Sequence, residues 1–167
     1  MIRKALVNDS SRLAEIHVFG WRCAYNEFIS MEHLINKMTV KSREEKWIDI
    51  LTETKESNVT YVYEENNIVK GFMTIGDCRD EDKTIETFEL WGIYIDPLFQ
   101  RQCVGSKLVS HCEAEAITKR KKEIVLWVFE KNKNSIKFYN KMGFEFDGKV
   151  KLLDYFNENE IRMCKGL

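Results

Sequence analysis

Proline is almost absent from this chain, which has one, Pro97, among 167 residues, together with only eight glycines. That scarcity excludes collagen-like and proline-rich disordered chains. Hydrophobic residues make up 44% of the sequence, as in an ordinary globular protein, and the length suits one domain with a sizeable core. We therefore expect a single domain over residues 1–167.

An excess of charge is missing as well, because 26 lysines and arginines face 27 aspartates and glutamates, for a net charge of -1. This balance gives no electrostatic reason to expect nucleic acid or an anionic membrane as a partner. No apolar run approaches the roughly 20 residues of a membrane span, and residues 1–10 turn polar too early for a signal peptide. We expect a cytoplasmic protein.

Disulfide and metal-binding patterns are also lacking. The five cysteines are an odd number and include no CxxC pair, and the three histidines stand in no metal-binding spacing. The pattern excludes a disulfide framework and a zinc site and is typical of a reducing compartment. We expect no bound metal.

Hydrophobic periodicity predicts alternating strands and helices, and hence a mixed α/β (α+β) sheet with helices on both faces. Asp9 or Ser10 is expected to cap the first helix, and Ser42 with Glu45 to form a capping box for a later one. Strands are predicted at 1–7, 59–65, 68–76, 86–96, 123–129, 144–150 and 160–165, and helices from about 11, at 31–38, after 42, at 105–120 and at 135–142.

The stretch 88–108 is the most informative part of the chain. It contains an apolar strand ended by Asp96 and Pro97, a polar loop at 100–106 (QRQCVGS), and a helix start. Backbone N–H groups at a helix N-terminus bind phosphate well. A lone glycine before a helix also marks an ordinary turn, so a phosphate site and a plain turn are both open.

Four further positions bear on the chemistry. Glu89 is either a solvent-facing residue or a base in a cleft, with its proton affinity raised by burial beside Trp91. Gly92 predicts a bulge or a close backbone approach, and a bulge would splay this strand from its neighbour. Composition favours the core for Tyr139 and a cap for Asn132.

Three segments in order along the chain match known signatures. Residues 89–97 read ELWGIYIDP, residues 100–105 read QRQCVG, close to the pattern Q/R-x-x-G-x-G/A, and residues 132–144 read NKNSIKFYNKMGF. With these the chain resembles the GNAT superfamily of N-acetyltransferases over nearly its whole length. The resemblance implies a mostly antiparallel central sheet with one splayed parallel strand pair.

The resemblance also implies acetyl-CoA as cosubstrate, held between the strands 89–96 and 123–129. Its pantetheine arm would pair with the first strand, and the 100–106 loop would hold the pyrophosphate. The residues implied in cofactor binding are Ile93, Tyr94, Ile95, Gln100, Arg101, Gln102, Cys103, Val104, Gly105, Ser106 and Asn132. Cys103 departs from the family's glycine, which lets the backbone approach the pyrophosphate without a Cβ, and a cysteine is tolerated there if its φ is negative.

Catalytic roles follow from the same resemblance. Glu89 would deprotonate the incoming ammonium through water, and Tyr139 would protonate the departing thiolate. Trp21, Tyr25 and Trp91 are candidates for an aromatic wall that faces a cationic amine. Packing of the first helix is the alternative for Trp21 and Tyr25.

The expected acceptor is a small-molecule amine such as a polyamine, an amino acid or an amino sugar. One alternative is a protein acetyltransferase that modifies a chain terminus or a lysine. The other is a non-catalytic acyl-CoA-binding regulator, which Cys103 favours and the presence of both Glu89 and Tyr139 opposes. Homodimers are frequent in this family, and residues 149–167 offer the last strands through which they form.

Overall fold

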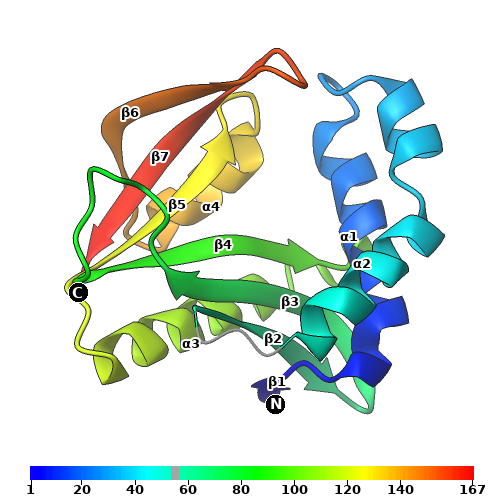
Figure 1. The fold of residues 1–167 in the computed structure, drawn as a ribbon, viewed down its shortest axis with the longest axis horizontal. Helices are drawn as coiled ribbons and strands as arrows, with labels where there is room; N and C mark the ends of the chain where they lie inside the picture. The colour runs from blue at the N-terminus through cyan, green and yellow to red at the C-terminus, as the bar shows by residue number, and fades with distance from the viewer. Residues whose placement is uncertain (54–56) are drawn as a thin grey trace. The chain divides into compact units, whose positions relative to one another are not determined.

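The computed structural model describes residues 1–53 and 57–167 (Figure 1). Strands and helices alternate along the chain, as the periodicity predicted. The strands are β1 (Ile2–Lys4), β2 (Asn58–Glu65), β3 (Ile68–Asp77), β4 (Thr87–Ile95), β5 (Glu123–Phe129), β6 (Glu145–Leu153) and β7 (Glu158–Gly166). The helices are α1 (Ser10–Tyr25), α2 (Val40–Thr52), α3 (Val104–Thr118) and α4 (Lys133–Lys141), with short helical turns η1 (Val7–Asp9), η2 (His33–Lys37) and η3 (Pro97–Phe99).

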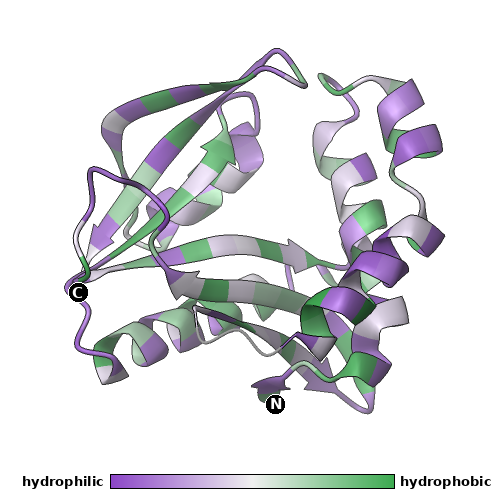
Figure 2. Ribbon diagram, viewed as in Figure 1, coloured by the Kyte–Doolittle hydropathy of each residue, from purple (hydrophilic) through white to green (hydrophobic). Residues whose placement is uncertain are grey.

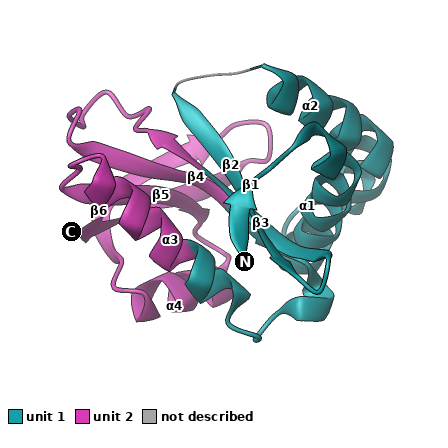
Figure 3. Ribbon diagram, turned by 90° about the horizontal axis from the view of Figure 1, so that it is seen from below, with its two compact units in different colours: residues 1–74, 93–108 teal, residues 75–92, 109–167 magenta. Residues whose placement is uncertain are grey.

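The seven strands form one sheet in the order β1-β2-β3-β4-β5-β7-β6. Strands β4 and β5 pair in parallel, whereas β1 with β2, β5 with β7 and β6 with β7 pair antiparallel. The predicted fold class, a mixed and mostly antiparallel sheet with one parallel pair, is therefore confirmed. Contacts divide the chain into two compact units, residues 1–74 with 93–108 and residues 75–92 with 109–167 (Figure 3).

The first unit holds α1, α2 and the β2–β3 hairpin. The hairpin turn is Asn66–Asn67, both with positive φ (54° and 61°), as a tight two-residue connection requires. Helices α1 and α2 carry hydrophobic and hydrophilic residues on different sides (Figure 2). Their apolar sides pack with the hairpin into a core of Leu13, Ala14, Ile16, Trp47, Val62, Val69 and Phe72.

The second unit is centred on β5, whose sequence EIVLWVF is mostly buried. Its parallel ladder with β4 runs only from Thr87↔Glu123 to Leu90↔Leu126, whereas its antiparallel ladder with β7 continues to Phe129↔Glu160. Along β4, residues 87–90 are buried and residues 91–95 are partly exposed. The parallel pairing therefore ends two residues before Gly92, the position where the sequence predicted a splay.

Neither predicted helix cap forms the expected side-chain hydrogen bond to its helix. Asp9 occupies the N-cap position of α1, but its carboxylate accepts hydrogen bonds from the Leu6 N–H (2.7 Å) and from Arg3. Helix α2 begins earlier than predicted and is capped by Thr39, whose hydroxyl accepts from the Ser42 N–H (3.2 Å). In both cases another partner within reach satisfied the polar group, which a local pattern does not reveal.

The chain's five cysteines are all free thiols. Within the described ranges, 1–53 and 57–167, the side chains form no cluster of three or more histidine, cysteine or acidic residues fit for a metal ion. The helices of those ranges are all too short or too polar to cross a membrane.

Candidate functional site

The loop at 100–106 is positioned by Asp96, the residue that follows β4. Its N–H donates to the Lys70 carbonyl of β3 (3.0 Å), and its carboxylate accepts from the Leu98 N–H (2.8 Å). The same carboxylate is paired with Arg12 of α1. Pro97 follows in the first position of η3, where its missing N–H costs nothing. The chain therefore leaves the sheet at a fixed point and angle.

The first turn of α3 presents unpaired backbone donors. The first hydrogen bond of this helix joins the Lys107 N–H to the Cys103 carbonyl (3.0 Å). The N–H groups of Val104, Gly105 and Ser106 come before it and have no acceptor inside the helix. Together with the positive end of the helix dipole, they form an arrangement that suits an anion such as a pyrophosphate.

The loop before α3 is held in a strained backbone conformation. Cys103 has φ of 60° and Arg101 has φ of 59°, both in the left-handed region. The condition of a negative φ at Cys103 is therefore not met. The backbone follows the course that a glycine would take, so the side chain at this position carries the strain, at a cost of about 1–2 kcal/mol. Both side chains are exposed and do not fill the loop.

A close approach of backbones was missed in the sequence. A Cβ on Gly71 of β3 would lie 2.7 Å from Cδ1 of Ile95 and 3.0 Å from the carbonyl oxygen of Tyr94. Glycine at this position lets β3 lie tightly against the end of β4. A glycine inside the apolar run IVKGFMTIG was the available signal.

An aromatic cluster in the first unit contains two of the predicted acceptor residues. The indole N–H of Trp21 donates to the Tyr94 hydroxyl (3.2 Å), and the rings of Trp21 and Tyr25 meet edge to face at 4.9 Å. His17 stacks on Tyr94 with 4.3 Å between ring centroids. Tyr94, which the resemblance assigned to the cofactor, thus joins this cluster through its side chain. All four residues are partly exposed.

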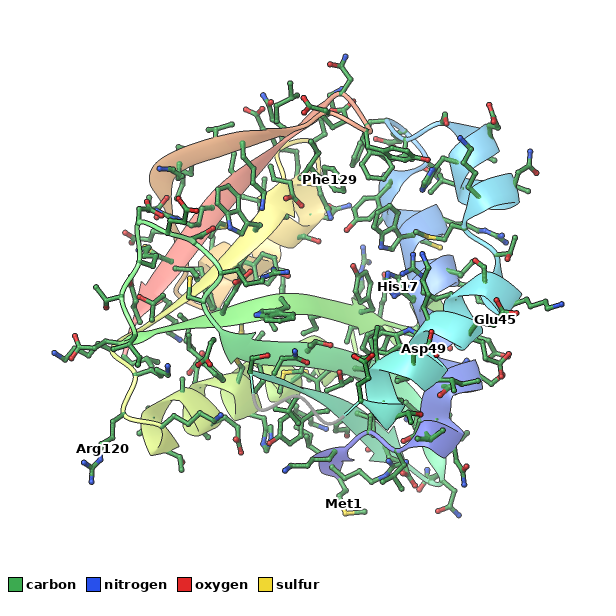
Figure 4. All side chains as sticks on the ribbon, viewed as in Figure 1. Met1, His17, Glu45, Asp49, Arg120 and Phe129 are labelled. Atoms are coloured by element: carbon green, nitrogen blue, oxygen red, sulfur yellow. The ribbon has the colours of Figure 1, made fainter. Side chains whose placement is uncertain are left out.

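His17 is a neutral member of this cluster (Figure 4). Desolvation lowers its pKa to about 3, and the positive charges of Arg43 and Lys46 on α2 act in the same direction. Its Nδ1 atom is buried and has no hydrogen-bond partner within the described residues. No pattern in the sequence indicated a role for this histidine.

Glu89 lies in the second unit and is buried, with 1% of its surface exposed. Its carboxylate accepts from the Arg79 backbone N–H (2.9 Å) and from Nε of Arg79 (3.0 Å), and it forms an ion pair with the Arg79 guanidinium. The solvent-facing interpretation is therefore wrong. Glu89 is instead a buried anion whose acceptor positions are filled by one arginine.

Trp91 contacts the arginine of this ion pair. The Arg79 guanidinium lies 4.3 Å from the ring centroid of Trp91, and the Trp91 N–H donates to the Asp77 carbonyl (3.1 Å). About half of the Arg79 side chain is exposed. Trp91 thus contacts the guanidinium that pairs with Glu89. It belongs to a different unit from Trp21 and Tyr25.

Asn132 and Tyr139 lie at the two ends of α4. Asn132 caps the helix, with its side-chain oxygen accepting from the Ser135 N–H (3.2 Å), which leaves its amide N–H groups for another partner. Tyr139 is 8% exposed and has ring contacts with Phe138 and Phe144. The cap and the core position expected from the residues alone are both confirmed, and neither excludes contact with a ligand.

A buried arginine holds the loop between β3 and β4, and the sequence did not indicate it. The side chain of Arg162 on β7 is 5% exposed and donates to Asp80 (3.0 Å), Asp82 (2.7 Å) and Asp147 (2.7 Å). Asp80 follows Arg79 directly, so the partner of Glu89 is attached to a fixed point of the sheet.

A family model settles the relationship. The model of the acetyltransferase (GNAT) family matches residues 24–144. The chain belongs to the GNAT family. The matched range includes β4, the 100–106 loop, β5 and α4, which hold all the predicted cofactor and catalytic positions.

Similar proteins agree with this assignment. The chain is 30% identical over 138 residues, 83% of its own length and 76% of the other's, to the uncharacterized N-acetyltransferase YuaI of Bacillus subtilis. It is 34% identical over 83 residues, 50% of its length and 48% of the other's, to an L-methionine sulfoximine/L-methionine sulfone acetyltransferase of Salmonella typhimurium. This GNAT protein is an acetyl-CoA-dependent N-acetyltransferase.

Solved structures share the fold. The PaiA N-acetyltransferase from Thermoplasma acidophilum, in complex with coenzyme A, has a TM-score of 0.79 and 22% identity, covering 100% of this chain and 98% of that one. A ribosomal-protein-alanine N-acetyltransferase from Brucella melitensis has a TM-score of 0.74 and 20% identity, with coverage of 100% and 99%.

Relief of the strain at Cys103 is a direct test of the loop geometry. We expect Cys103→Gly to raise the free energy of unfolding by about 1 kcal/mol, because glycine adopts positive φ without a steric cost. Urea denaturation measures the change. Cys103→Ala is the matched control, since it removes the thiol but keeps the Cβ. An equal effect of both variants would show that the thiol, not the backbone, carries the difference.

The environment of His17 predicts an acid-sensitive stability. Because its pKa in the folded state is about 3, the unfolded chain binds a proton below about pH 6.5 that the folded chain does not. Stability therefore falls with decreasing pH, by at most about 1.4 kcal/mol per pH unit from this residue. We expect His17→Gln to lose that slope between pH 6.5 and 4 in urea titrations. His111→Gln, on α3, is the control, and identical slopes for wild type and His17→Gln would contradict the assignment.

Proposed function

We propose that this GNAT protein transfers the acetyl group of acetyl-CoA to the primary amine of a small molecule by direct attack. The first turn of α3 carries the proposal, because its three unpaired N–H groups and its helix dipole suit the pyrophosphate of coenzyme A. The φ of Cys103 is positive, a conformation that the family's glycine would adopt without strain.

In this reaction the amine nitrogen attacks the thioester carbonyl, a C–N bond forms and the C–S bond breaks. The products are an N-acetylated amine, coenzyme A and one proton. Tyr139 gives its hydroxyl proton to the departing thiolate, and its burial keeps bulk water away from that step. Asn132 donates an amide N–H to the pantetheine arm.

Glu89 takes the proton of the incoming ammonium through water in this proposal. Its oxygens are engaged by Arg79, so the carboxylate has to be released before it accepts a proton. An ammonium carries the same charge as the guanidinium and therefore competes with Arg79 for Glu89. The half-exposed side chain of Arg79 has room to move into solvent.

A small-molecule acceptor is supported by the Salmonella relative, which is named for L-methionine sulfoximine and L-methionine sulfone and is 34% identical over half of this chain. The ribosomal-protein-alanine acetyltransferase is similar in fold alone. A protein acceptor therefore stays the second candidate, to be separated by competition between peptides and small amines.

Binding of acetyl-CoA tests the phosphate loop. We expect wild type to bind with micromolar affinity in calorimetric titrations and Gly105→Glu to lose that binding, because a carboxylate at the first turn of α3 repels the pyrophosphate. Ser110→Glu, an exposed position on the same helix, adds the same charge without blocking the first turn and should bind normally. Equal affinity in Gly105→Glu and wild type would remove the loop from the proposal.

Turnover tests the two catalytic residues. We expect Tyr139→Phe and Glu89→Gln each to lower kcat by about 10²–10⁴-fold at neutral pH, the contribution of a positioned acid or base. Release of coenzyme A with a panel of primary amines measures kcat, and Tyr155→Phe at an exposed tyrosine is the control. Normal kcat in either variant would exclude that residue. A wild type that binds acetyl-CoA and acetylates none of the amines would favour the regulatory alternative.

A further inference from the structure

Arg43 is a partly buried cation that has no counter-ion among the described residues. It lies in the first turns of α2, where its backbone N–H donates to the Thr39 carbonyl (3.1 Å). Within residues 1–53 and 57–167, its guanidinium has no hydrogen bond or ion pair with any group. Desolvation lowers the pKa of this side chain. A guanidinium shielded from water in this way favours an anionic partner.

The helix itself offers Arg43 no anion. The positions three and four residues away, where side chains on a helix meet, hold Thr39, Val40, Lys46 and Trp47. Of the acidic residues of the same helix, Glu44 is adjacent in sequence and does not share a face with Arg43, and Glu45 and Asp49 are exposed (Figure 4). The sequence therefore leaves this charge to be neutralised from outside α2.

Arg43 lies beside the aromatic cluster of the first unit. Its charge acts on His17 and His33 and interacts with Tyr94. Trp47, one turn after Arg43 on α2, has its ring 6.1 Å from that of His17, which places this side of α2 against the aromatic cluster. Trp21, in contact with His17 and Tyr94, belongs to the same cluster.

Two further polar atoms of this region lack partners within the described residues. The indole N–H of Trp47, one turn after Arg43, is buried and unpaired, and Trp47 is only 5% exposed. Nδ1 of His17 is also buried and unpaired, and the two rings lie 6.1 Å apart. Since buried polar groups in folded proteins are almost always hydrogen-bonded, three unsatisfied groups on α1 and α2 indicate a missing ligand or ordered water.

We propose that Arg43 binds a carboxylate of the acceptor, next to His17 and Tyr94, and that the acceptor is therefore an amino acid. The inference rests on the proposed acetyl transfer and narrows its acceptor. A guanidinium holds a carboxylate through two parallel N–H···O bonds, which fix its orientation. The rings of Trp21 and Tyr25 provide faces for the ammonium of the same molecule. A polyamine, which has only cationic groups, would be repelled by Arg43.

Paired acceptors that differ only in the carboxylate test this. L-amino acids are compared with their decarboxylated amines, starting with L-methionine sulfone and 3-(methylsulfonyl)propylamine, and spermidine represents the polyamines. We expect wild type to prefer the amino acid of a pair. Arg43→Gln should raise KM for amino acids by about 10- to 100-fold, the worth of a charge-assisted hydrogen bond, with little change in kcat. Its kcat/KM for the decarboxylated amines should stay within about threefold of wild type.

Two variants serve as controls. Lys46→Gln removes a neighbouring exposed cation from α2 and should keep the preference for amino acids. Arg43→Lys keeps the positive charge but not the two parallel N–H donors of the guanidinium, so its KM for amino acids should lie between those of wild type and Arg43→Gln. If Arg43→Gln melts far below wild type, Arg43→Lys decides the outcome. A KM of Arg43→Lys equal to that of wild type would show that the two parallel N–H donors of the guanidinium are not used.

Several results would overturn the proposal. These are a wild type that prefers spermidine or the decarboxylated amines, an equal loss on both members of each pair in Arg43→Gln, and a weaker affinity of this variant for acetyl-CoA. The last result would assign the guanidinium to a phosphate of the cofactor.

A binding experiment separates failure of this inference from failure of acetyl transfer. The intrinsic fluorescence of the tryptophans beside Arg43 is titrated with the same L-amino acids and amines in wild type and Arg43→Gln. Amino-acid binding that is lost in Arg43→Gln supports a carboxylate site even if no amine is acetylated. If wild type acetylates amines but binds no amino acid more tightly than its decarboxylated partner, the carboxylate site is wrong while the proposed function stands.

Discussion

The carboxylate of Asp96 is the constraint on which the first unit depends. It accepts from the Leu98 N–H at the point where β4 ends, and it is paired with Arg12 of α1. A backbone bond from Asp96 to Lys70 ties the same residue to β3. The strand, the helix and the turn before α3 are therefore connected through one side chain. Because the 100–106 loop follows within four residues, its strained backbone is held by contacts outside the loop itself.

The second unit is organised by buried charge. Glu89 and Arg162 are both almost completely buried, and each is satisfied by partners from the loop between β3 and β4. Buried ion pairs contribute little net stability, but removal of one partner costs several kcal/mol. The loop that carries Arg79 and Asp80 is thus fixed at both of these residues. The Arg79 side chain covers the Glu89 carboxylate and fills its acceptor positions.

Buried polar groups are matched in some places of the described chain and left without a partner in others. In the second unit the buried carboxylate and guanidinium are matched within the chain. In the first unit Arg43, the Nδ1 atom of His17 and the indole N–H of Trp47 have no partner within the described residues. Unpaired buried polar groups lower the stability of a fold, so stability alone would favour apolar groups at these positions. Their presence around an aromatic cluster is the pattern expected where a ligand completes the hydrogen bonding.

Local patterns in the sequence were sufficient for much of the architecture. Alternating and continuous apolar runs predicted β5 without error and the β2–β3 hairpin to within a residue or two, because strand burial and a two-residue Asn-Asn turn are decided by neighbouring residues. The family motifs located the loop at 100–106 and α4. Caps were predicted less well, since Asp9 and Ser42 had competing partners that lie a few residues away.

The sequence by itself determined the order of elements, the family and the positions of its motifs, because each of these depends on the spacing of residues that are close together in the chain. Tertiary structure alone decided how the charges pair. Arg79 lies ten residues from Glu89 and Arg162 eighty-two from Asp80, and no local rule connects residues so far apart. The positive φ of Cys103 also depends on the surrounding fold, as does the lack of a partner for the Arg43 guanidinium among the described residues.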